Sequence, residues 1–421
     1  MSEQIEQSNI TEPEDSASNL EDDAETNLNV NTDLNTSNLN ADEIDSRTLT
    51  KLRGDAIGDT MYSQSFVIRT LLQLKDLHWC EEAEEDFCSL WDMTVEKDVC
   101  NYLHELSFIS IACDSLVRYD EPRFVEIIIG TIANICSTNC NVQLPEGDVS
   151  VILNSLDTDD YLILIQMMRF IKAVVHRSTG EIEFVNEEIL SKILFVLRNS
   201  VYKDLLKVTL DVVHELTTDL KLRKEFVNVD LLASALTANE TLNKLEGDNN
   251  TIEDDTTNNL IENLVPLLRI VVNVCCYFEI AENRTILGDI NDFIVKLAVK
   301  FEDAFEFFSR DIKSSSTNEE FFYFVNTFNF VYPILNVPLS DRLFPQICEI
   351  INNLIDDDDV DMDPFVDCMR FVISSRSCEQ LKSDIQNSDY SRCLKFVLNY
   401  TGESKCEFEH KINYILHENC E

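Results

Sequence analysis

A repeat of about 40 residues, built from paired helices, constrains the fold of this chain more than any other feature of its sequence. The repeat is visible in "FISIACDSLVRYDEPRFVEIIIGTIANI" (108–135), "VSVILNSLDTDDYLILIQMMRFIKAVVH" (149–176) and "SKILFVLRNSVYKDLLKVTLDVVHEL" (191–216). Each segment reads as a short helix, a polar turn and a longer, more apolar helix. Equivalent positions recur 40 and then 41 residues apart, as in Ala133, Ala173 and His214.

Helix pairs at this period are typical of armadillo and HEAT arrays, where each unit buries its apolar face against its neighbours. The sequence therefore predicts an all-α, armadillo- or HEAT-like right-handed superhelix over residues 53–421, interrupted by a long polar loop at 239–259. Eight glycines and eight prolines in 421 residues are too few for a many-stranded fold. Further helices are expected at 289–309, 318–332, 339–355, 364–376 and 388–400, with a terminal cap at 404–418.

The N-terminal stretch has a different character. Residues 1–50 contain thirteen acidic residues, a single basic residue and no aromatic side chain. Such a stretch buries too little apolar surface to offset its chain entropy. We therefore expect residues 1–52 to be a disordered acidic tail.

The net charge of −45 arises from 78 acidic and 33 basic residues. This field repels nucleic-acid phosphates and anionic lipid surfaces, so neither nucleic acid nor a membrane is an expected partner. It favours basic protein partners, although acidic loops also serve simply to keep a large helical protein in solution.

The fourteen cysteines lack the tight, even spacing of a disulfide-rich secreted module, and the first residues do not form a signal peptide. These features indicate a reducing, intracellular environment. The most apolar window, residues 264–280, is interrupted by a proline and two charged residues, so no transmembrane segment is predicted.

No motif in the chain predicts catalysis, a metal or a cofactor. Cys113, Cys136 and Cys140 lack the paired spacing of a zinc site and are interpreted as core residues. The acidic run at 355–363 fails the EF-hand pattern and is interpreted as a solvated loop. The six histidines are scattered, so a non-enzymatic protein is expected unless folding brings a cysteine or carboxylate to a histidine within a pocket.

Two asparagines are candidate binding residues. Asn134 and Asn273 stand among apolar residues on the longer helices, which in armadillo-like arrays line a concave surface. Each is either a ladder asparagine that bonds a partner's backbone or a buried amide that is satisfied internally.

Three stretches resemble one family. These are "RGDAIGDTMYS" (53–63), "CSLWDMTVEKDV" (88–99) and "FVEIIIGTIANI" (124–135), which in this order are similar to the serum amyloid A-like protein 1 family. Its members are armadillo-like helical proteins and resemble no apolipoprotein. The resemblance implies an intracellular, nuclear, non-enzymatic protein that promotes cell proliferation, notably of synovial fibroblasts in vertebrates.

Trp91 and Asp92 lie within the second of these stretches. We expect Trp91 to anchor the first helices at the end of the array and Asp92 to cap the following turn or helix, with a docking surface as the alternative. The function predicted from the whole sequence is an intracellular protein-interaction scaffold. The alternative is a transport-type adaptor that binds basic localisation peptides on its concave face.

Overall fold

The computed structural model describes residues 54–76, 78–138, 144–177, 185–218, 227–247, 253–281, 290–310, 319–337, 339–357, 360–385, 390–400 and 411–412. Over these residues the chain is helical, and the β pairing found there is an isolated bridge between Ala56 and Ser63. The predicted all-α class is confirmed for this part of the chain. The predicted acidic tail, residues 1–52, lies outside it, as does most of the cap predicted at 404–418.

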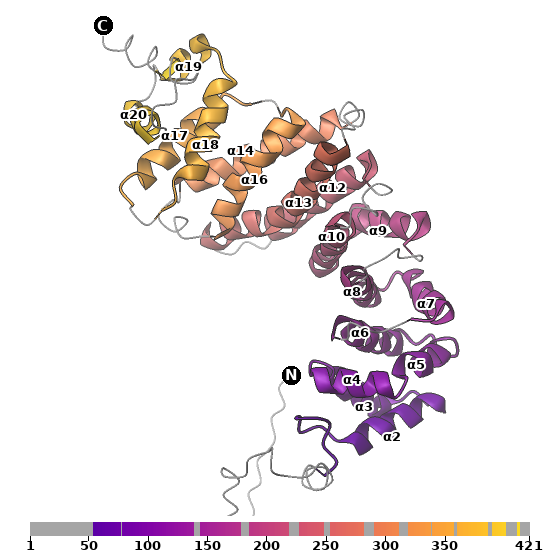
Figure 1. The fold of residues 1–421 in the computed structure, drawn as a ribbon. Helices are drawn as coiled ribbons and strands as arrows, with labels where there is room; N and C mark the ends of the chain where they lie inside the picture. Colours follow the sequence, from indigo (N-terminus) through magenta and orange to yellow (C-terminus); the bar gives the residue numbers. More distant parts are fainter. Residues whose placement is uncertain are drawn as a thin grey trace, which may run out of the picture. The chain divides into compact units, whose positions relative to one another are not determined.

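The helices of the compact unit Asp55–Glu421 form two layers, and in most pairs the longer helix lies in the first layer. Each first-layer helix packs on the next, and α6, α8 and α10 lie one above another in Figure 1. The first layer consists of α3 (Glu81–Met93), α6 (Pro122–Thr138), α8 (Tyr161–Arg177), α10 (Lys203–Thr218), α13 (Glu253–Ala281), α16 (Glu319–Leu335) and α18 (Asp363–Ser374).

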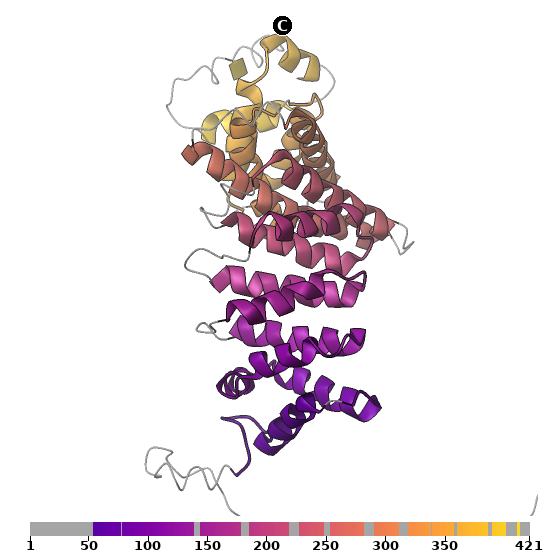
Figure 2. The ribbon, with the colours of Figure 1, turned by 90° about the vertical axis from the view of Figure 1, so that its right-hand side faces the viewer.

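The second layer supplies the partner of each of these helices. It consists of α2 (Gln64–Lys75), α5 (Phe108–Leu116), α7 (Glu146–Leu153), α9 (Glu187–Asn199), α12 (Val229–Gly247), α14 (Asn291–Arg310), α17 (Leu343–Leu354) and α20 (Ser391–Tyr400). The helix α4 (Lys97–Glu105) packs on α5 and α6, the short 3-10 helix η3 (Asn154–Leu156) extends α7, and α19 (Cys378–Ile385) follows α18. Figure 2 shows the pairs succeeding one another in sequence order.

The predicted repeat corresponds to successive helix pairs. The first unit is α5 with α6, the second is α7 and η3 with α8, and the third is α9 with α10. Ala133, Ala173 and His214 occupy α6, α8 and α10, as the spacing predicted. A helix that buries one face against its pair and its flanks against both neighbours needs little else to be stable.

Short polar side chains start several of these helices. The N-cap Ser63 accepts a hydrogen bond from the Phe66 amide at the start of α2, and Asn186 accepts one from the Ile189 amide at the start of α9. Asp160 accepts from the Leu162 amide just inside α8. Each cap satisfies an amide that the helix itself leaves without a partner, and is worth about 1 kcal/mol.

The helix α6 lies deepest in the array. Between Phe124 and Cys136, Val125 and Asn134 are half-buried and every other residue is buried. The reason is contact on all sides, because α6 packs against α3, α4, α5 and α8. Each buried isoleucine contributes about 1.5–3 kcal/mol of transfer free energy, so this helix supports the N-terminal part of the unit.

Phenylalanines fill the interior of the later repeats. Phe301 and Phe305 of α14 meet Phe324 and Phe328 of α16 with ring centroids 5.0–5.4 Å apart. All four rings are fully buried, and so is Tyr332, whose ring lies 4.0 Å from that of Phe328. The richness in phenylalanine is therefore explained by packing between the layers.

The long loop predicted at 239–259 is wrong for most of its length. Residues up to Gly247 continue α12, and residues from Glu253 onward belong to α13. The polar side chains join the two helices: buried Asn239 donates to the carbonyl of Asn263 (2.9 Å), whose own amide donates to Asn243 (3.2 Å). Polarity there reflects hydrogen bonding between helices, which composition alone does not distinguish from solvation.

Among the described residues, no helix combines the length and the apolar character needed to cross a membrane.

Candidate functional site

Trp91 lies near the C-terminal end of α3 and packs against α6. It is half-buried against the core, and its indole rests on Gly130. A Cβ atom at position 130 would lie 2.4 Å from Cε2 and Cζ2 of the indole, so only glycine permits this approach. The contact supports the predicted anchoring of the first helices, while a docking role for Trp91 stays a prediction.

Asp92 is exposed in the last turn of α3 and does not cap the next helix. The N-cap position of α4 is Glu96, and α4 starts without a side-chain cap. Instead, Thr94 and Val95 form a turn after α3, in which their amides donate to the backbone carbonyls of Trp91 and Asp92. The predicted capping of the following helix by Asp92 is therefore wrong, because α4 begins one residue after Glu96, too far along the chain for Asp92 to reach its first amides.

Asn134 joins three first-layer segments through its carboxamide. Its Nδ2 donates to Oγ1 of Thr94, just after α3, at 2.7 Å, and its Oδ1 accepts from Nη2 of Arg169 on α8 at 2.6 Å. The Thr94 hydroxyl donates in turn to the carbonyl of Trp91 (2.5 Å), and Arg169 also donates to Gln166 (2.6 Å). Asn134 is thus bonded internally, although it remains half-exposed.

The next interface, between α8 and α10, carries two further polar contacts. Nζ of Lys172 lies 2.6 Å from Oδ2 of Asp211, and Nδ1 of His176 lies 3.0 Å from Oε2 of Glu215. Both contacts lie at the solvent boundary, because the Lys172 and Asp211 side chains are 38% and 39% exposed. Each is worth at most about 1 kcal/mol to stability, so their effect is mainly on the shape and charge of the surface.

Asn273 on α13 repeats the pattern one helix further along. Its Nδ2 lies 3.1 Å from the hydroxyls of Thr217 and Thr218 and 3.3 Å from the carbonyl of His214, all on α10. Of the two roles predicted for these asparagines, that of an amide satisfied within the chain thus agrees with their contacts. We call the whole row the polar seam; it comprises Thr94, Asn134, Gln166, Arg169, Lys172, His176, Asp211, His214, Glu215, Thr217, Thr218, Arg269 and Asn273.

Sequence reasoning found the two asparagines but missed their charged neighbours. A signal was present, because contacts across the seam and beside it follow the repeat period. Lys172 and Asp211 are 39 residues apart, as are His176 and Glu215, and Thr94 and Asn134 are 40 apart. Polar residues separated by one repeat therefore face each other on adjacent first-layer helices.

Comparison with curated proteins links the chain to one group of relatives. It is 26% identical over 173 residues to the protein saal1 of Danio rerio, a match that covers 36% of this chain and 37% of the relative. It is 25% identical over 203 residues to SAAL1 of Mus musculus and 27% identical over 202 residues to SAAL1 of Homo sapiens. Each of the latter matches covers 41% of this chain and 42% of the relative.

The chain is similar to these SAAL1 proteins over part of its length. The resemblance inferred from the three sequence stretches is thereby confirmed. The matches span about two fifths of the length of these curated SAAL1 relatives. No family model matches the chain.

Burial lowers the pKa of two basic groups of the seam. The pKa of His214 is lowered, first because the half-buried ring is desolvated and then because Arg269 lies nearby, against the opposing effect of Glu215. Burial also lowers the pKa of the Arg169 guanidinium, which nevertheless stays charged at neutral pH. The seam thus presents fixed cations, acidic partners and a neutral imidazole side by side.

The cysteines predicted to be core residues lie in the core where the structure describes them. Cys113 and Cys136 are buried, and burial raises the pKa of each thiol to about 12. Cys140 lies outside the described residues. No cluster of three or more His, Cys, Asp or Glu side chains suited to a metal ion occurs among the residues that were described.

Proposed function

We propose that this chain is a non-enzymatic protein-interaction scaffold, an armadillo-like right-handed superhelix that presents the polar seam to a partner protein. The observation that carries the proposal is the seam itself. It runs across five consecutive stacked segments from α3 to α13 and consists largely of half-exposed hydrogen-bonding groups. Such a row offers donors and acceptors at the spacing of stacked helices, which suits an extended peptide.

The internal hydrogen bonds of the seam support this role, and they do not use all of its hydrogen-bonding capacity. A carboxamide has two N–H donors and two acceptor sites, and Asn134 uses one of each within the chain. The remaining donor and acceptor are held in a fixed orientation by Thr94 and Arg169. A partner that bonds them loses little of its binding free energy to ordering of the side chain.

The charge of the seam bears on the kind of partner. The chain as a whole carries a net charge of −45, which favours a basic partner at long range. The seam itself, however, also contains three cations, Arg169 and Lys172 on α8 and Arg269 on α13. It therefore gives no reason to prefer a transport-type adaptor for basic localisation peptides over a general scaffold.

The protonation and exposure of the side chains that could act in catalysis support the proposal that the protein is not an enzyme. The thiols of Cys113 and Cys136, with pKa values raised to about 12, are protonated and inert at neutral pH. His176 does lie beside a carboxylate, that of Glu215, but its side chain is 68% exposed. A solvated pair of this kind lacks the water-excluded surroundings that make general base catalysis effective.

The proposal includes a nuclear location and a role in promoting cell proliferation. Both are supported by the resemblance of residues 53–135 to the serum amyloid A-like protein 1 family. Neither depends on the geometry of the seam.

Site-specific photo-crosslinking of the full chain in intact cells tests the scaffold. A benzophenone amino acid is placed at exposed Ser137, one turn from Asn134 on α6, and in a control chain at exposed Val295 on the second-layer helix α14. We expect a discrete crosslinked protein at position 137 that is absent at position 295. Lys172→Glu should weaken this product without changing the melting temperature.

Identical products from the two positions would show that the seam has no special partner. The same conclusion would follow if Lys172→Glu left the product from position 137 unchanged.

A further inference from the structure

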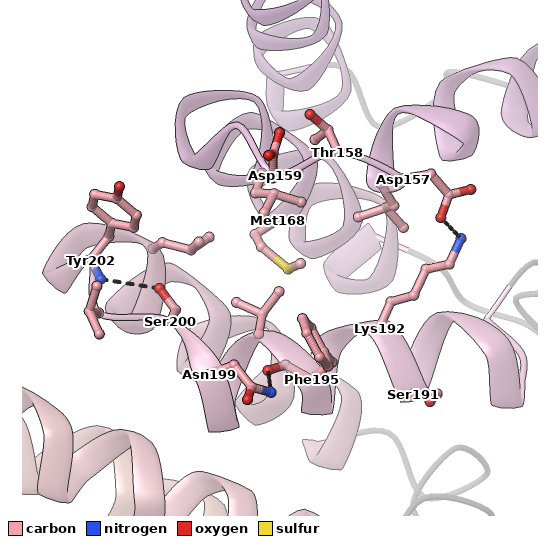
Figure 3. A pocket seen from close by; sticks show the side chains of 15 residues that line it. Asp157, Thr158, Asp159, Met168, Ser191, Lys192, Phe195, Asn199, Ser200 and Tyr202 are labelled. Atoms are coloured by element: carbon pink, nitrogen blue, oxygen red, sulfur yellow. Dashed lines mark hydrogen bonds and ion pairs between the residues drawn. The ribbon is translucent and has the colours of Figure 1, made fainter.

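A hollow of about 920 Å³ lies on the second layer, between the start of α8 and the helices α9 and α10. Figure 3 shows its lining, in which Lys192 of α9 reaches the carboxylate of Asp157 across one end. The floor is apolar and well packed, formed by buried Leu156, Met168, Val196 and Leu205. Its volume falls within the range of about 300–1,000 Å³ that is usual for ligand sites.

The rim of this hollow is apolar as well. The side chains of Phe195, Val201 and Tyr202 are 65%, 62% and 47% exposed. Among the phenylalanines whose side chains the structure describes, Phe195 alone is exposed, whereas twelve others are fully buried. Composition therefore does not explain its exposure, and an exposed aromatic at a hollow is typical of a binding surface.

A second hollow, of about 570 Å³, is lined by Leu190, Leu194 and Arg198 on the same helix. Ser191, Phe195 and Asn199 line both hollows, and we call this shared stretch of α9 the ridge. Lys192, Phe195, Val196 and Asn199, which line the first hollow, are spaced as one face of α9. We call the two hollows and the ridge together the Phe195 groove.

The rim is held in place by local contacts. The ring of Tyr202 stacks on that of Tyr161 at a centroid distance of 4.0 Å and an interplanar angle of 8°. The Tyr202 amide donates to the Ser200 hydroxyl (3.2 Å), and Nδ2 of Asn199 donates to the carbonyl of Phe195 (2.8 Å), as Figure 3 shows. A preformed rim lowers the entropy lost when a partner binds.

The charged residues of the Phe195 groove are mainly acidic. Its two cations are already paired, Lys192 with Asp157 at 2.7 Å and Arg198 with Asp230 at 3.3 Å. Asp159, at the first hollow, and Glu187, at the second, make no ion pair with any described residue. Each end of the groove therefore keeps an unneutralised carboxylate beside an apolar surface.

We propose that the Phe195 groove docks a short segment of a basic partner protein, in which a bulky apolar side chain stands within a few residues of a lysine or arginine. The apolar side chain packs beside Phe195, and the cation meets Asp159 or Glu187. Charge argues against the chain's own residues 1–50, with thirteen acidic residues and one basic, and against a second copy with its net charge of −45. The groove lies on the second layer, so this binding is separate from binding at the polar seam.

The test begins with a library of random 12-residue peptides displayed on phage and selected on the full chain. We expect the selected peptides to share a bulky apolar residue next to Lys or Arg. A synthetic peptide with the shared pattern should bind at least tenfold more weakly to Phe195→Ala and to Asp159→Lys, and more weakly as salt is raised. Both substituted residues are exposed, so the melting temperature should stay the same.

Two control variants make the result specific. Val295→Ala changes another exposed apolar residue, on the helix α14, and should bind the peptide like the unmodified chain. Lys172→Glu in the polar seam should also leave peptide binding unchanged. The proposal would be overturned if the selected peptides shared acidic residues, or if Phe195→Ala bound the peptide as tightly as the unmodified chain. It would also be overturned if Lys172→Glu alone lost binding, and that outcome would place the peptide at the seam instead.

Discussion

The indole of Trp91 covers Gly130 so closely that the two residues fix the distance between α3 and α6. A Cβ at Gly130 would lie 2.4 Å from two carbons of the ring and 2.8 Å from Nε1. Gly130 stands in the middle of a helix, where glycine costs about 1 kcal/mol relative to alanine. Glycine stands at position 130 despite this loss of helix propensity because the close contact with Trp91 leaves no room for a Cβ atom.

Gly130→Ala should destabilise the protein, although helix propensity alone predicts the opposite. We expect a net loss of about 1–3 kcal/mol, because the indole must move away from the new methyl group. The matched control is Gly147→Ala in α7, where nothing lies within 4 Å of the added Cβ and where stability should stay the same or rise by up to about 1 kcal/mol. Urea unfolding measures both, and equal effects in the two variants would disprove the close approach.

Gly58→Ala should cost more than Gly54→Ala. Both glycines have positive φ, +55° and +62°, so each alanine incurs strain of about 1–2 kcal/mol. At Gly58 the new Cβ would also lie 2.1 Å from Oδ2 of Asp98, the atom that accepts a hydrogen bond from the Asp59 amide. We expect about 1 kcal/mol of additional loss at Gly58 from this hydrogen bond, measured by thermal melting. Melting temperatures that fall equally would mean that strain alone matters.

Asn134→Leu should weaken the polar seam by about 2–4 kcal/mol. The change removes the bond to Thr94 and the bond from Arg169, and it leaves a largely buried guanidinium without that acceptor. Arg169→Met tests the coupling, since the double variant should lose less stability than the sum of the two single variants. Strict additivity in urea unfolding would indicate that the two side chains act independently.

Arg123→Met should destabilise the protein by about 2–3 kcal/mol because it leaves the buried carboxylate of Glu126 without its cation. Nη1 of Arg123 lies 2.7 Å from Oε2 of Glu126, whose side chain is 7% exposed. Arg370→Met is a matched control, since Arg370 also pairs with a carboxylate three residues away, that of Asp367, which is 59% exposed. The control should lose less than about 1 kcal/mol. A similar loss in both variants would show that burial of Glu126 is unimportant.

Stability should fall as the pH is lowered through the range in which unfolded histidine becomes protonated. Burial lowers the pKa of His214 in the folded state below its usual value of about 6.5. The unfolded state then binds the proton more tightly, so the free energy of unfolding decreases as the pH falls from 8 towards 6. His214→Gln should reduce this slope, measured by urea unfolding at a series of pH values; an unchanged slope would exclude His214 as a contributor.

The amino-acid sequence was enough to predict the helical class, the repeat and the resemblance to SAAL1 proteins. Ala133, Ala173 and His214 take equivalent places in α6, α8 and α10 because periodic burial leaves a periodic pattern of apolar residues. The position of Trp91 beside the core also followed from residue type. These inferences are local, since one helix and its neighbours are enough to produce them.

Which side chains meet became clear only from the arrangement of the helices in space. Composition suggested a loop where Asn239 and Asn263 actually join α12 to α13, and the bonds of Asn134 to Thr94 and Arg169 depend on how α3, α6 and α8 are placed side by side. The exposure of Phe195, in a chain that buries most of its phenylalanines, was likewise not visible in the sequence. Periodicity specifies which face of a helix is buried, but the rotation and offset between neighbouring helices depend on packing over the whole interface.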